Sequence, residues 1–465
     1  MRSQQVIVFI SLILGLNAYA KSAENPVPPS FKTIRYEEDY RYLKDQPTQA
    51  DWLDGIKYID LPFMPDAYLR LGGELRERYQ NLSNYEFGLT ETNNDDYLLQ
   101  RVLLHADIHL GRHFRSFVQF GSHYVFGKDN EKISVEENHL DLQQGFAELK
   151  FPIGTNEITV RGGRQEMSFG SDRLVSVRNN PNIRRSFDAV RVGLNRNKLK
   201  LDAFYAVPLE LRRGVFNDDS DAKQSFWGIY GVLAEPLAVP EINTDLYYLG
   251  LDRGGAAYTQ GTANEQRHSV GVRLWGKPAP WDYNFEFVYQ FGDFGTADIQ
   301  AWTAASDTGY RWTDVPLKPR LGLKADVVSG DDNPNDNTLQ TFNPLFPKLA
   351  YFSENALIVP ANLFNVFPYL ELEIVEDVDF TVGWDFLWRY STNDAFYVNP
   401  FRPLEGTELS TERYIGSELT LDMSWQVNRN IQLSTAYVHL FASDLLNSVG
   451  ADDVDFFMLM GSYRF

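Results

Sequence analysis

The sequence contains no cysteine, so no disulfide can hold the chain together. It also lacks a long apolar run beyond its N-terminus, since no later window reaches the ~18 consecutive apolar residues that a transmembrane helix needs. Catalytic signatures are missing too: there is no Gly-x-Ser-x-Gly, no HExxH and no phosphate-binding loop, and the histidines are dispersed. These absences argue against a disulfide-stapled domain, a helical membrane protein and an enzyme. We expect no catalytic residue, no metal ligand and no cofactor.

The first 20 residues have the pattern of an export signal. Arg2 supplies a positive end, the apolar core Val6–Leu16 is too short for a membrane helix, and Ala18-Tyr19-Ala20 fits a small-x-small cleavage site. We predict a signal peptide over residues 1–20 with cleavage near Ala20. Residues 21–66 show little strand pattern, and we interpret them as a periplasmic N-terminal segment that either tucks into the following domain or is free.

From residue 67 to residue 465, apolar and polar residues alternate in short segments, as they do along β-strands with two different faces. Between residues 68 and 80 one register is apolar and the other carries Arg70, Arg76 and Arg78. Between residues 98 and 110 the polar register carries Arg101. A soluble sandwich would bury the apolar face in a core, whereas a transmembrane barrel turns it to lipid and lines a wet lumen with the charged face.

The lengths of the connections favour the barrel. Short turns, such as those at 111–113 and 236–240, alternate with long polar loops, as in a barrel with short periplasmic turns and long extracellular loops. The last segment ends with Phe465 on its apolar register, which resembles the C-terminal signature of bacterial outer-membrane barrels. We predict an all-β fold over residues 67–465, a transmembrane antiparallel β-barrel of about 18 strands. The long loops are expected near residues 81–96, 127–138, 166–186, 207–224, 252–266, 330–364, 391–413 and 443–452.

One stretch, residues 158–191, is strongly positive in a chain whose net charge is −20. Its pattern indicates a strand, a long polar loop at 166–186 and the start of the next strand. An arginine that faces lipid near the midplane costs ~2–4 kcal/mol, so these side chains must lie in the lumen or in water. Rings of arginine favour anions, and the guanidinium group binds carboxylates in a bidentate manner. The arginines of this stretch are Arg161, Arg164, Arg173, Arg178, Arg184, Arg185 and Arg191.

Two roles remain open for each of these arginines. In the first, the 166–186 loop folds inward and its arginines form an anion-selective constriction, which the four arginines of the first two strands extend. In the second, pairs of the type Arg173–Asp172 and Arg185–Asp188 brace the loop against acidic walls. The concentration of positive charge in one stretch favours the constriction for the cluster as a whole.

Two further expectations are specific. Arg164 falls on the apolar register of its strand, so we expect either a bulge at Gly162-Gly163 or a position at the rim of the barrel. The 330–364 loop begins with an acidic run, 331–337, which lacks the spacing of an EF-hand and is expected to be solvated. Its apolar part, 342–363, has the bulk to form a lid or plug over a pore.

These stretches are similar to motifs of a known family. GGRQEMSFGSDRLVSVRNNPNIRRSFDAVR, at 162–191, resembles the Gly-Arg-Gln … Gly-Asp-Arg-Leu … Arg-Ser-Phe-Asp-Gly-Val-Arg pattern of the alginate export family, with Ala189 in place of a frequent Gly. SGDDNPNDNTLQTFNPLFPKLAYF, followed by PANL, resembles its second signature, and LRLGGELRERYQ its first strand. The resemblance covers roughly residues 66–465. It implies an outer-membrane barrel with an electropositive, arginine-lined constriction, and it implies polyanion contacts for the arginines of 158–191.

We therefore expect a channel in the outer membrane of a Gram-negative cell that passes anionic solutes, such as the uronate polysaccharide alginate or its oligomers. The alternatives are an anion-selective porin for small organic acids, and an outer-membrane enzyme or adhesin with a closed lumen. Expected partners are the anionic solute, outer-membrane lipid and lipopolysaccharide, and periplasmic export proteins, but not nucleic acid. The candidate substrate-binding residues are the pore-lining arginines Arg70, Arg76, Arg78, Arg101, Arg161, Arg164, Arg173, Arg178, Arg184, Arg185 and Arg191.

Overall fold

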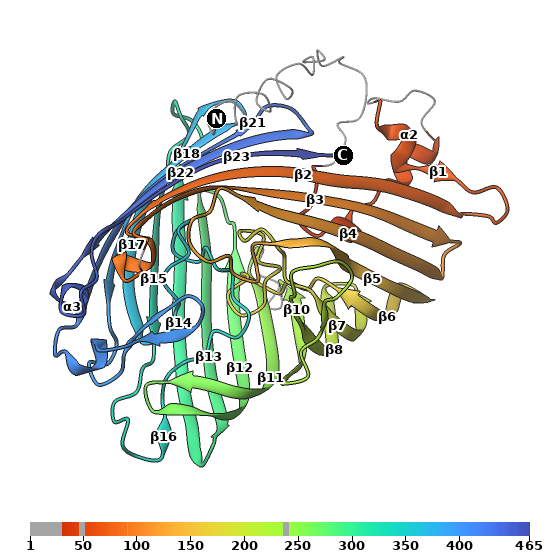
Figure 1. Cartoon of the computed structure of the whole chain (residues 1–465). Helices are drawn as coiled ribbons and strands as arrows, with labels where there is room; N and C mark the ends of the chain where they lie inside the picture. The colour runs from red at the N-terminus through yellow and green to blue at the C-terminus, as the bar shows by residue number, and fades with distance from the viewer. Residues whose placement is uncertain (1–29, 46–51, 91, 236–240) are drawn as a thin grey trace.

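The computed structural model describes residues 30–45, 52–90, 92–235 and 241–465. Within these ranges, 18 antiparallel strands form one sheet that closes on itself, because β2 pairs with β23 (Figure 1). The predicted antiparallel β-barrel is thereby confirmed. Its strands, in order, are β2 (Tyr68–Ser83), β3 (Asn94–Leu110), β4 (Phe114–Phe126), β5 (Asn138–Ile153), β6 (Asn156–Gln165), β7 (Phe187–Arg196), β8 (Leu199–Glu210), β10 (Gln224–Ala234), β11 (Asn243–Tyr258), β12 (Gly261–Gly276), β13 (Trp281–Phe294), β14 (Ala297–Arg311), β15 (Arg320–Val328), β17 (Leu363–Val375), β18 (Val378–Trp388), β21 (Tyr414–Gln426), β22 (Ile431–Ala442) and β23 (Val454–Arg464).

Short elements lie in the connections and before the barrel. No helix in the described ranges is long and apolar enough to cross a membrane. The short elements are η1 (Arg35–Glu37), η2 (Arg41–Asp45), α2 (Asp54–Lys57), β1 (Ile59–Asp60), η3 (Tyr85–Gly88), β9 (Asp219–Ser220), β16 (Thr338–Leu339), β19 (Phe396–Val398), β20 (Arg402–Leu404), η4 (Thr407–Leu409) and α3 (Asp444–Asn447).

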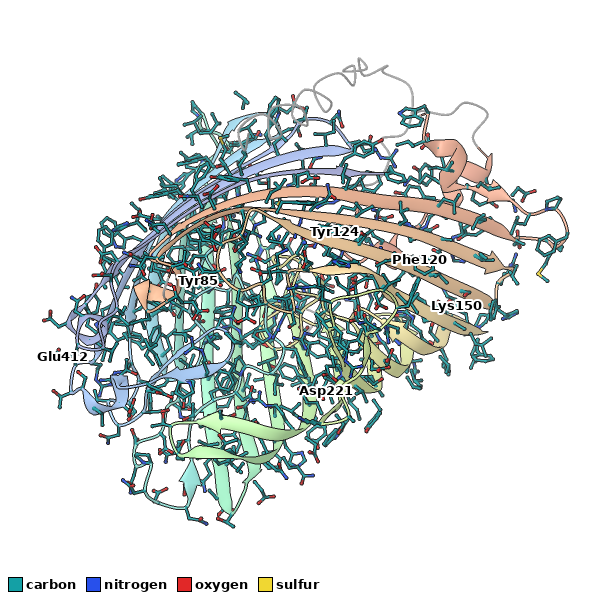
Figure 2. All side chains as sticks on the ribbon, in the orientation of Figure 1. Tyr85, Phe120, Tyr124, Lys150, Asp221 and Glu412 are labelled. Atoms are coloured by element: carbon teal, nitrogen blue, oxygen red, sulfur yellow. The ribbon has the colours of Figure 1, made fainter. Side chains whose placement is uncertain are left out.

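Alternation along each strand separates an outer side from a lumenal side. On β3, Leu104 and Ile108 are exposed on the outer surface, whereas Arg101 and Asp107 are buried inside the barrel. On β23 the predicted register also holds, because Phe457 is exposed while its neighbours are buried. Figure 2 shows side chains crowding the space that the strands enclose. The apolar belt and the charged lumen therefore follow from the two-residue period of the sequence.

The connections alternate in length, except that those at 259–260 and 295–296, at the end of the barrel that carries the long loops, are short. Residues 111–113 and 154–155 form short turns at the periplasmic end, and the long loops 166–186 and 329–362 lie at the other end. The long loop predicted at 252–266 is wrong, because β11 and β12 pair continuously up to a short turn at 259–260. The polar residues that gave the appearance of a loop lie on strands that continue past the pairing of Asp252 with Gln266. The turn predicted at 236–240 lies outside the described residues.

Two extracellular loops fold into the barrel and fill much of it. The 166–186 loop and the 329–362 loop meet at a parallel bridge between Val175 and Phe346. Their apolar side chains, among them Phe169, Phe346 and Phe352, form one core with inward side chains of the wall such as Phe226. A fully buried side chain of this size contributes roughly 1.5–3 kcal/mol relative to an exposed one, so the two loops are held firmly. The expectation that the second loop has the bulk of a plug agrees with this arrangement.

The acidic run at 331–337 is only partly solvated. Asp331 is fully buried. Its backbone N–H donates to the Asp394 carboxylate at 3.0 Å, and its own carboxylate accepts from the Asn333 N–H at 2.9 Å. Burial raises the pKa of Asp331 to about 6. The expectation of a solvated run is therefore wrong for Asp331, although Asp332 and Asp336 are exposed.

The N-terminal segment, residues 30–45 and 52–66, lies at the periplasmic mouth of the barrel (Figure 1). Arg35 is buried and donates to the main-chain oxygens of Gly73 and Phe465, both at 2.8 Å, where the first and last barrel strands meet. Its neighbour Tyr36 reaches the 166–186 loop and donates to the Glu166 carbonyl at 2.8 Å. The segment thus ties the barrel seam to the inward loop. The predicted signal peptide, residues 1–20, lies outside the described residues.

Candidate functional site

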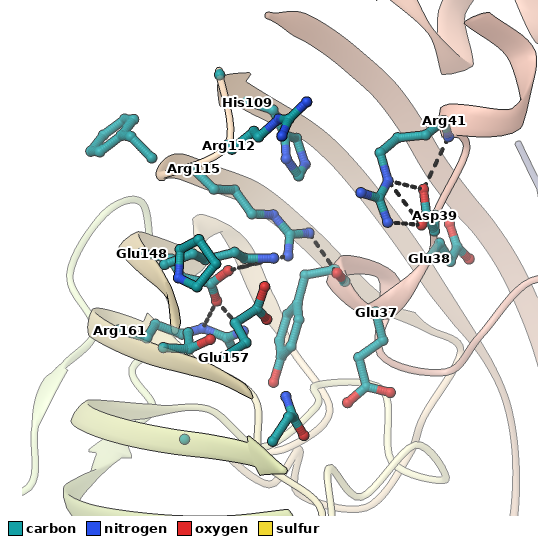
Figure 3. A pocket seen from close by; sticks show the side chains of 18 of the residues that line it. Glu37, Glu38, Asp39, Arg41, His109, Arg112, Arg115, Glu148, Glu157 and Arg161 are labelled. Atoms are coloured by element: carbon teal, nitrogen blue, oxygen red, sulfur yellow. Dashed lines mark hydrogen bonds and ion pairs between the residues drawn. The ribbon is translucent and has the colours of Figure 1, made fainter. Parts of the chain in front are cut away.

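A cavity of about 850 Å³ opens at the periplasmic end of the barrel, between the wall and the N-terminal segment (Figure 3). Arg161 and Arg191 line it, as predicted for wet-face residues of β6 and β7. Its lining holds eight basic and seven acidic side chains, so the cavity is close to charge balance. We call it the periplasmic vestibule. Its walls attract both signs of charge rather than anions alone.

Each arginine of the vestibule wall faces a carboxylate. Arg161 forms an ion pair with Glu148 at 2.5 Å, and its guanidinium lies 4.1 Å from the centroid of the Tyr36 ring. Arg191 forms an ion pair with Asp202 at 2.7 Å. These pairs hold the guanidinium groups in fixed positions and cancel most of their net charge.

Three arginines of β2 and β3 clamp the 166–186 loop. Arg76 donates to the carbonyls of Asn179 and Pro181 at 2.7 and 2.9 Å. Arg78 donates to the Asn180 carbonyl at 2.8 Å and also pairs with Glu354 of the second loop. Arg101 pairs with Glu74 at 2.6 Å and donates to the Asn179 side chain. Backbone carbonyls of the loop thus satisfy guanidinium groups that a lumen of water would otherwise hydrate.

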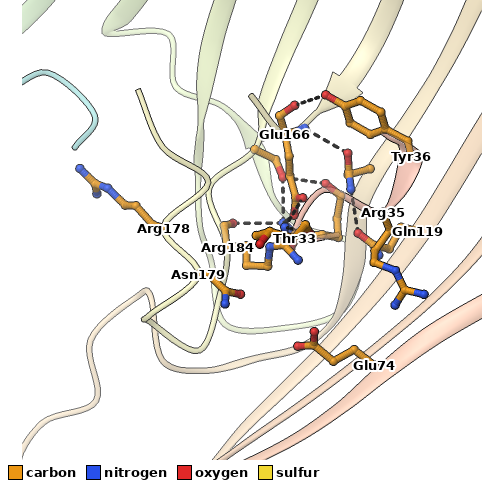
Figure 4. A network of polar contacts seen from close by, with 12 residues as sticks. Thr33, Arg35, Tyr36, Glu74, Gln119, Glu166, Arg178, Asn179 and Arg184 are labelled. Atoms are coloured by element: carbon orange, nitrogen blue, oxygen red, sulfur yellow. Dashed lines mark hydrogen bonds and ion pairs between the residues drawn. The ribbon is translucent and has the colours of Figure 1, made fainter. Parts of the chain in front are cut away.

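The remaining paired arginines join separate parts of the chain (Figure 4). Arg184 pairs with Glu166 at 2.7 Å and donates to the Thr33 carbonyl of the N-terminal segment. The specific pairs expected between sequence neighbours are wrong. Arg173 does brace the loop against an acidic wall, as the second role allowed, but it binds Glu286 at 2.9 Å and Asp326 at 3.0 Å rather than Asp172. Arg70 of β2 pairs with Glu38 of the N-terminal segment at 3.2 Å and with Asp107 of β3 at 3.0 Å.

Arg164 lies at the extracellular rim, as the second of the two expectations allowed. It is the penultimate residue of β6, and its guanidinium pairs with Asp188 at 3.0 Å and reaches the Asp218 carbonyl at 3.3 Å. The first alternative, a bulge at Gly162-Gly163, does not occur, because the pairing of β6 with both neighbours runs through these residues without a shift in register. Gly163 instead adopts a φ of 128°, and the strand pairing continues through it.

Arg178 and Arg185 differ from the other candidates. Neither has a carboxylate within ion-pair distance among the residues that the structure describes. Arg178 uses only its Nε, which donates to the Pro347 carbonyl at 3.1 Å, and Figure 4 shows its side chain pointing away from the Arg184 network. Arg185 lies over the Phe346 ring, 5.2 Å from its centroid. These two side chains carry positive charge that the protein does not neutralise with an ion pair.

Sequence reasoning missed other inward arginines. Arg115 of β4 lines the vestibule and pairs with Asp107 at 2.8 Å, and Arg267 of β12 is fully buried and paired with Glu265. The two-residue period would have found both, because each occupies the buried register of its strand. Acids that pair with lumenal arginines, such as Glu148, also lie on the buried register of their strands, so the same two-residue period would have found them.

A closed barrel with an apolar outer belt, inward-folded loops and a charged lumen defines a class of protein, the outer-membrane barrel channel. The chain belongs to the alginate export family, whose model matches residues 67–457. This match confirms the resemblance seen in the sequence motifs. No curated protein matches the chain significantly.

Solved structures show the same fold at low sequence identity. Acinetobacter baumannii OccAB3 aligns with a TM-score of 0.59 and 10% identity over 86% of this chain and 100% of its own. Pseudomonas aeruginosa OpdO aligns with a TM-score of 0.57 and 12% identity over 86% and 98%. Pseudomonas aeruginosa OccK2 (OpdF), solved in complex with glucuronate, aligns with a TM-score of 0.54 and 13% identity over 88% and 98%. These likenesses support the barrel fold, and with the family match they place the chain in the outer membrane as a channel.

Proposed function

We propose that this channel passes anionic solutes, with a uronate polysaccharide such as alginate, or its oligomers, as the cargo. The observation that carries the proposal is the 166–186 loop, which lies inside the barrel and brings Arg173, Arg178, Arg184 and Arg185 to its interior. Acids within the protein balance the charges of Arg173 and Arg184, and the surplus remains on Arg178 and Arg185. A surplus of one sign in a narrow, low-dielectric passage concentrates mobile ions of the opposite sign.

Two comparisons support an acidic sugar as cargo. The family to which the chain belongs is described as alginate export. A barrel of the same fold, OccK2, has been solved with glucuronate, which carries one carboxylate on a sugar ring. Arginines spaced along the lumen would hold such carboxylates weakly and in succession, so that a solute enters and also leaves. Periplasmic partners that deliver a polymer belong to this proposal as well.

A second candidate, a channel for small organic acids, is favoured by the packing of the interior. The 166–186 and 329–362 loops join in one apolar core with the wall, which leaves little room for a polymer unless they move. Small carboxylates need no such movement. An enzyme or adhesin with a closed lumen is the third candidate, and it predicts no conductance at all.

Planar-bilayer recording separates these candidates. The purified channel is inserted under a KCl gradient, and the reversal potential gives the ratio of anion to cation permeability. We expect anion preference, and transient current block by oligouronates whose length the passage accepts. Cation preference would contradict the anion channel. Block by glucuronate alone, with no effect of longer oligouronates, would favour the small-acid channel.

Deletion of the inner part of the second loop, residues 345–358, tests whether that loop fills the passage. The polymer channel predicts a larger conductance and block by longer oligouronates after the deletion. A variant that stays silent in the bilayer, although it migrates as a folded barrel in heat-modifiability gels, would favour the closed lumen of the third candidate.

A further inference from the structure

Arg178 and Arg185 lie next to each other although both are positively charged. The Arg185 N–H donates to the Val177 carbonyl at 2.7 Å, so the backbone brings position 185 beside position 178. Arg178 itself has a φ of 51°, a left-handed conformation that is unfavourable for a side chain of this size. Burial and the neighbouring Arg185 charge lower the pKa of Arg178 well below its usual range, and burial lowers the pKa of Arg185 to about 10. Such a pair is costly unless something negative shares it.

A small cavity lies between these two side chains. Its volume is about 30 Å³, which is the space of one water molecule or one small polar head group. Apolar side chains form much of its wall, so a charge placed there is poorly screened and interacts strongly with both guanidinium groups. The remaining positive charge of the wall, Arg184, is already neutralised by Glu166. The lining residues are Val135, Arg178, Ile183, Arg184, Arg185, Ser186, Leu209 and Leu211.

The cavity lies among the extracellular connections of the barrel. Val135 belongs to the connection between β4 and β5, and Leu209 and Leu211 lie at the extracellular end of β8. The periplasmic vestibule shares none of these residues. Asp221, whose charge favours the protonated form of Arg185, also belongs to an extracellular connection. The periplasmic vestibule is thus close to charge balance, whereas Arg178 and Arg185 have no ion pair among the residues that the structure describes.

We propose that Arg178 and Arg185 form a carboxylate-binding site at the outer end of the passage, which holds one carboxylate of a uronate or of a small organic acid. The inference rests on the proposed anion channel, and it adds the residues that contact the solute and the side of the membrane on which they lie. Two guanidinium groups offer paired N–H donors to one carboxylate, and the 30 Å³ cavity admits the head group while the rest of the solute stays in the outer mouth. The site would recruit acidic solutes from outside, or receive their leading carboxylate on the way out.

The test uses the full-length barrel in detergent and the double substitution R178Q/R185Q. Isothermal titration with glucuronate, a uronate trimer and uncharged glucose measures binding. We expect both acids to bind and glucose not to bind, and we expect R178Q/R185Q to weaken acid binding by at least about tenfold, because two charge-assisted contacts are lost. Tighter binding of the trimer than of glucuronate would assign the site to polymer ends, and equal binding would assign it to small acids.

The matched control is R212Q/R213Q. These two arginines lie on the same extracellular connection as Asp221, are exposed, and pair with acids of their own, so the control removes the same charge without touching the cavity. It should leave acid binding unchanged. The single substitution R185Q gives a second variant that is expected to fold, since the Arg185 side chain makes no hydrogen bond among the described residues. Among the described residues, R178Q/R185Q loses only the hydrogen bond from Arg178 to the Pro347 carbonyl, so it should lower the unfolding temperature less than loss of a bracing arginine would.

The proposal is overturned if neither acid binds the wild-type barrel, if R185Q and R178Q/R185Q bind like the wild type, or if R212Q/R213Q loses binding equally. Reversal potentials of the same preparations distinguish failure of the carboxylate site from failure of the proposed anion channel. Anion selectivity without binding at this site would contradict the proposed carboxylate site and leave the proposed anion channel standing. Cation selectivity would contradict the proposed anion channel, whatever the titrations show.

Discussion

Arg184 and Glu166 form a buried ion pair, and each depends on the other to remain charged inside the barrel. Arg184 → Ala leaves Glu166, which is fully buried, without its cation. Removing one partner of a buried pair usually costs about 3–5 kcal/mol. We expect the 166–186 loop to open more readily by this amount, measured as faster amide hydrogen exchange across its residues. The double substitution R184M/E166Q should restore most of the protection, and equal loss in both variants would show that the pair is not the cause.

Gly163 meets its neighbours more closely than any other residue type would allow. A Cβ on Gly163 would lie 2.3 Å from the Gly145 carbonyl oxygen, and its φ of 128° is accessible only to glycine. We expect Gly163 → Ala to destabilise the barrel by about 1–3 kcal/mol, read from its unfolding temperature in heat-modifiability gels. Gly162 → Ala is the matched control, since nothing lies within 4 Å of its Cβ position. Equal effects of the two substitutions would contradict this account.

The residue scale also marks the limit of what the sequence can predict. The two-residue period told which arginines face the lumen, because facing depends only on local alternation. Their partners depend on chain segments far apart: Arg173 pairs with Glu286, 113 positions away, and with Asp326, 153 positions away. Nothing local distinguishes those acids from Asp172. The sequence could not show that Arg178 and Arg185 lack ion pairs, because this also depends on residues far away in the chain.

At the scale of elements, the N-terminal segment is held by charges that include a buried lysine. Lys57 of α2 has no hydrogen-bond partner among the described residues, and its Nζ lies 5.3 Å from the centroid of the Tyr40 ring. Burial, together with the charges of Arg35, Arg70 and Arg429, lowers the pKa of Lys57 to about 7, and Glu38 only partly opposes this. The docked segment therefore favours a neutral lysine.

This lysine makes docking of the segment depend on pH. Its pKa is about 7 when docked and 10.5 when detached, so between these values the detached state binds more protons. Docking should strengthen as pH rises above 7, by at most about 1.4 kcal/mol per pH unit, and should be weakest at and below pH 7. Hydrogen exchange at residues 33–40, corrected for the intrinsic rate, measures this between pH 6 and about 9. Lys57 → Met should abolish the dependence, and an unchanged slope in that variant would exclude Lys57.

Element boundaries were predictable where polarity and strand pairing agree. The inward 166–186 loop was predicted to be a loop because its polar, proline-containing sequence has no alternation. The β11–β12 hairpin was missed because Asp252, Arg253 and Asn264 gave it the polarity of a loop. Strands that extend beyond the lipid belt face water on both sides, so their composition loses the contrast on which the prediction depends.

At the scale of the whole molecule, charge balance decides selectivity. Replacing Arg161, Arg164 and Arg191 together by Ala removes the ion-pair partners of Asp188 and Asp202 and leaves Glu148 with only its longer contacts to Arg115 and Lys150. We expect the anion-to-cation permeability ratio to fall more steeply than the loss of three positive charges alone would give, and even to invert. Reversal potentials in planar bilayers measure it.

The reciprocal variant, E148Q/D188N/D202N, should raise anion preference from the same positions. Unchanged selectivity in both variants would mean that these pairs serve only to stabilise the wall. The closed barrel was predictable from its alternation and from the parity of its loops. The inward packing of two loops and the N-terminal segment was not, because it depends on which apolar surfaces meet once the barrel has closed.

Arg35 bridges Gly73 and Phe465, and this has a consequence for the order of events during membrane insertion. The two main-chain oxygens come within reach of one guanidinium only when the first and last strands are side by side. The two Arg35 hydrogen bonds therefore cannot both form while the sheet is open. A probe near Tyr36, such as a protease site or an isotope-labelled amide, would then stay unprotected throughout insertion and become protected at the end. Its protection would time the moment at which the two edges of the sheet meet.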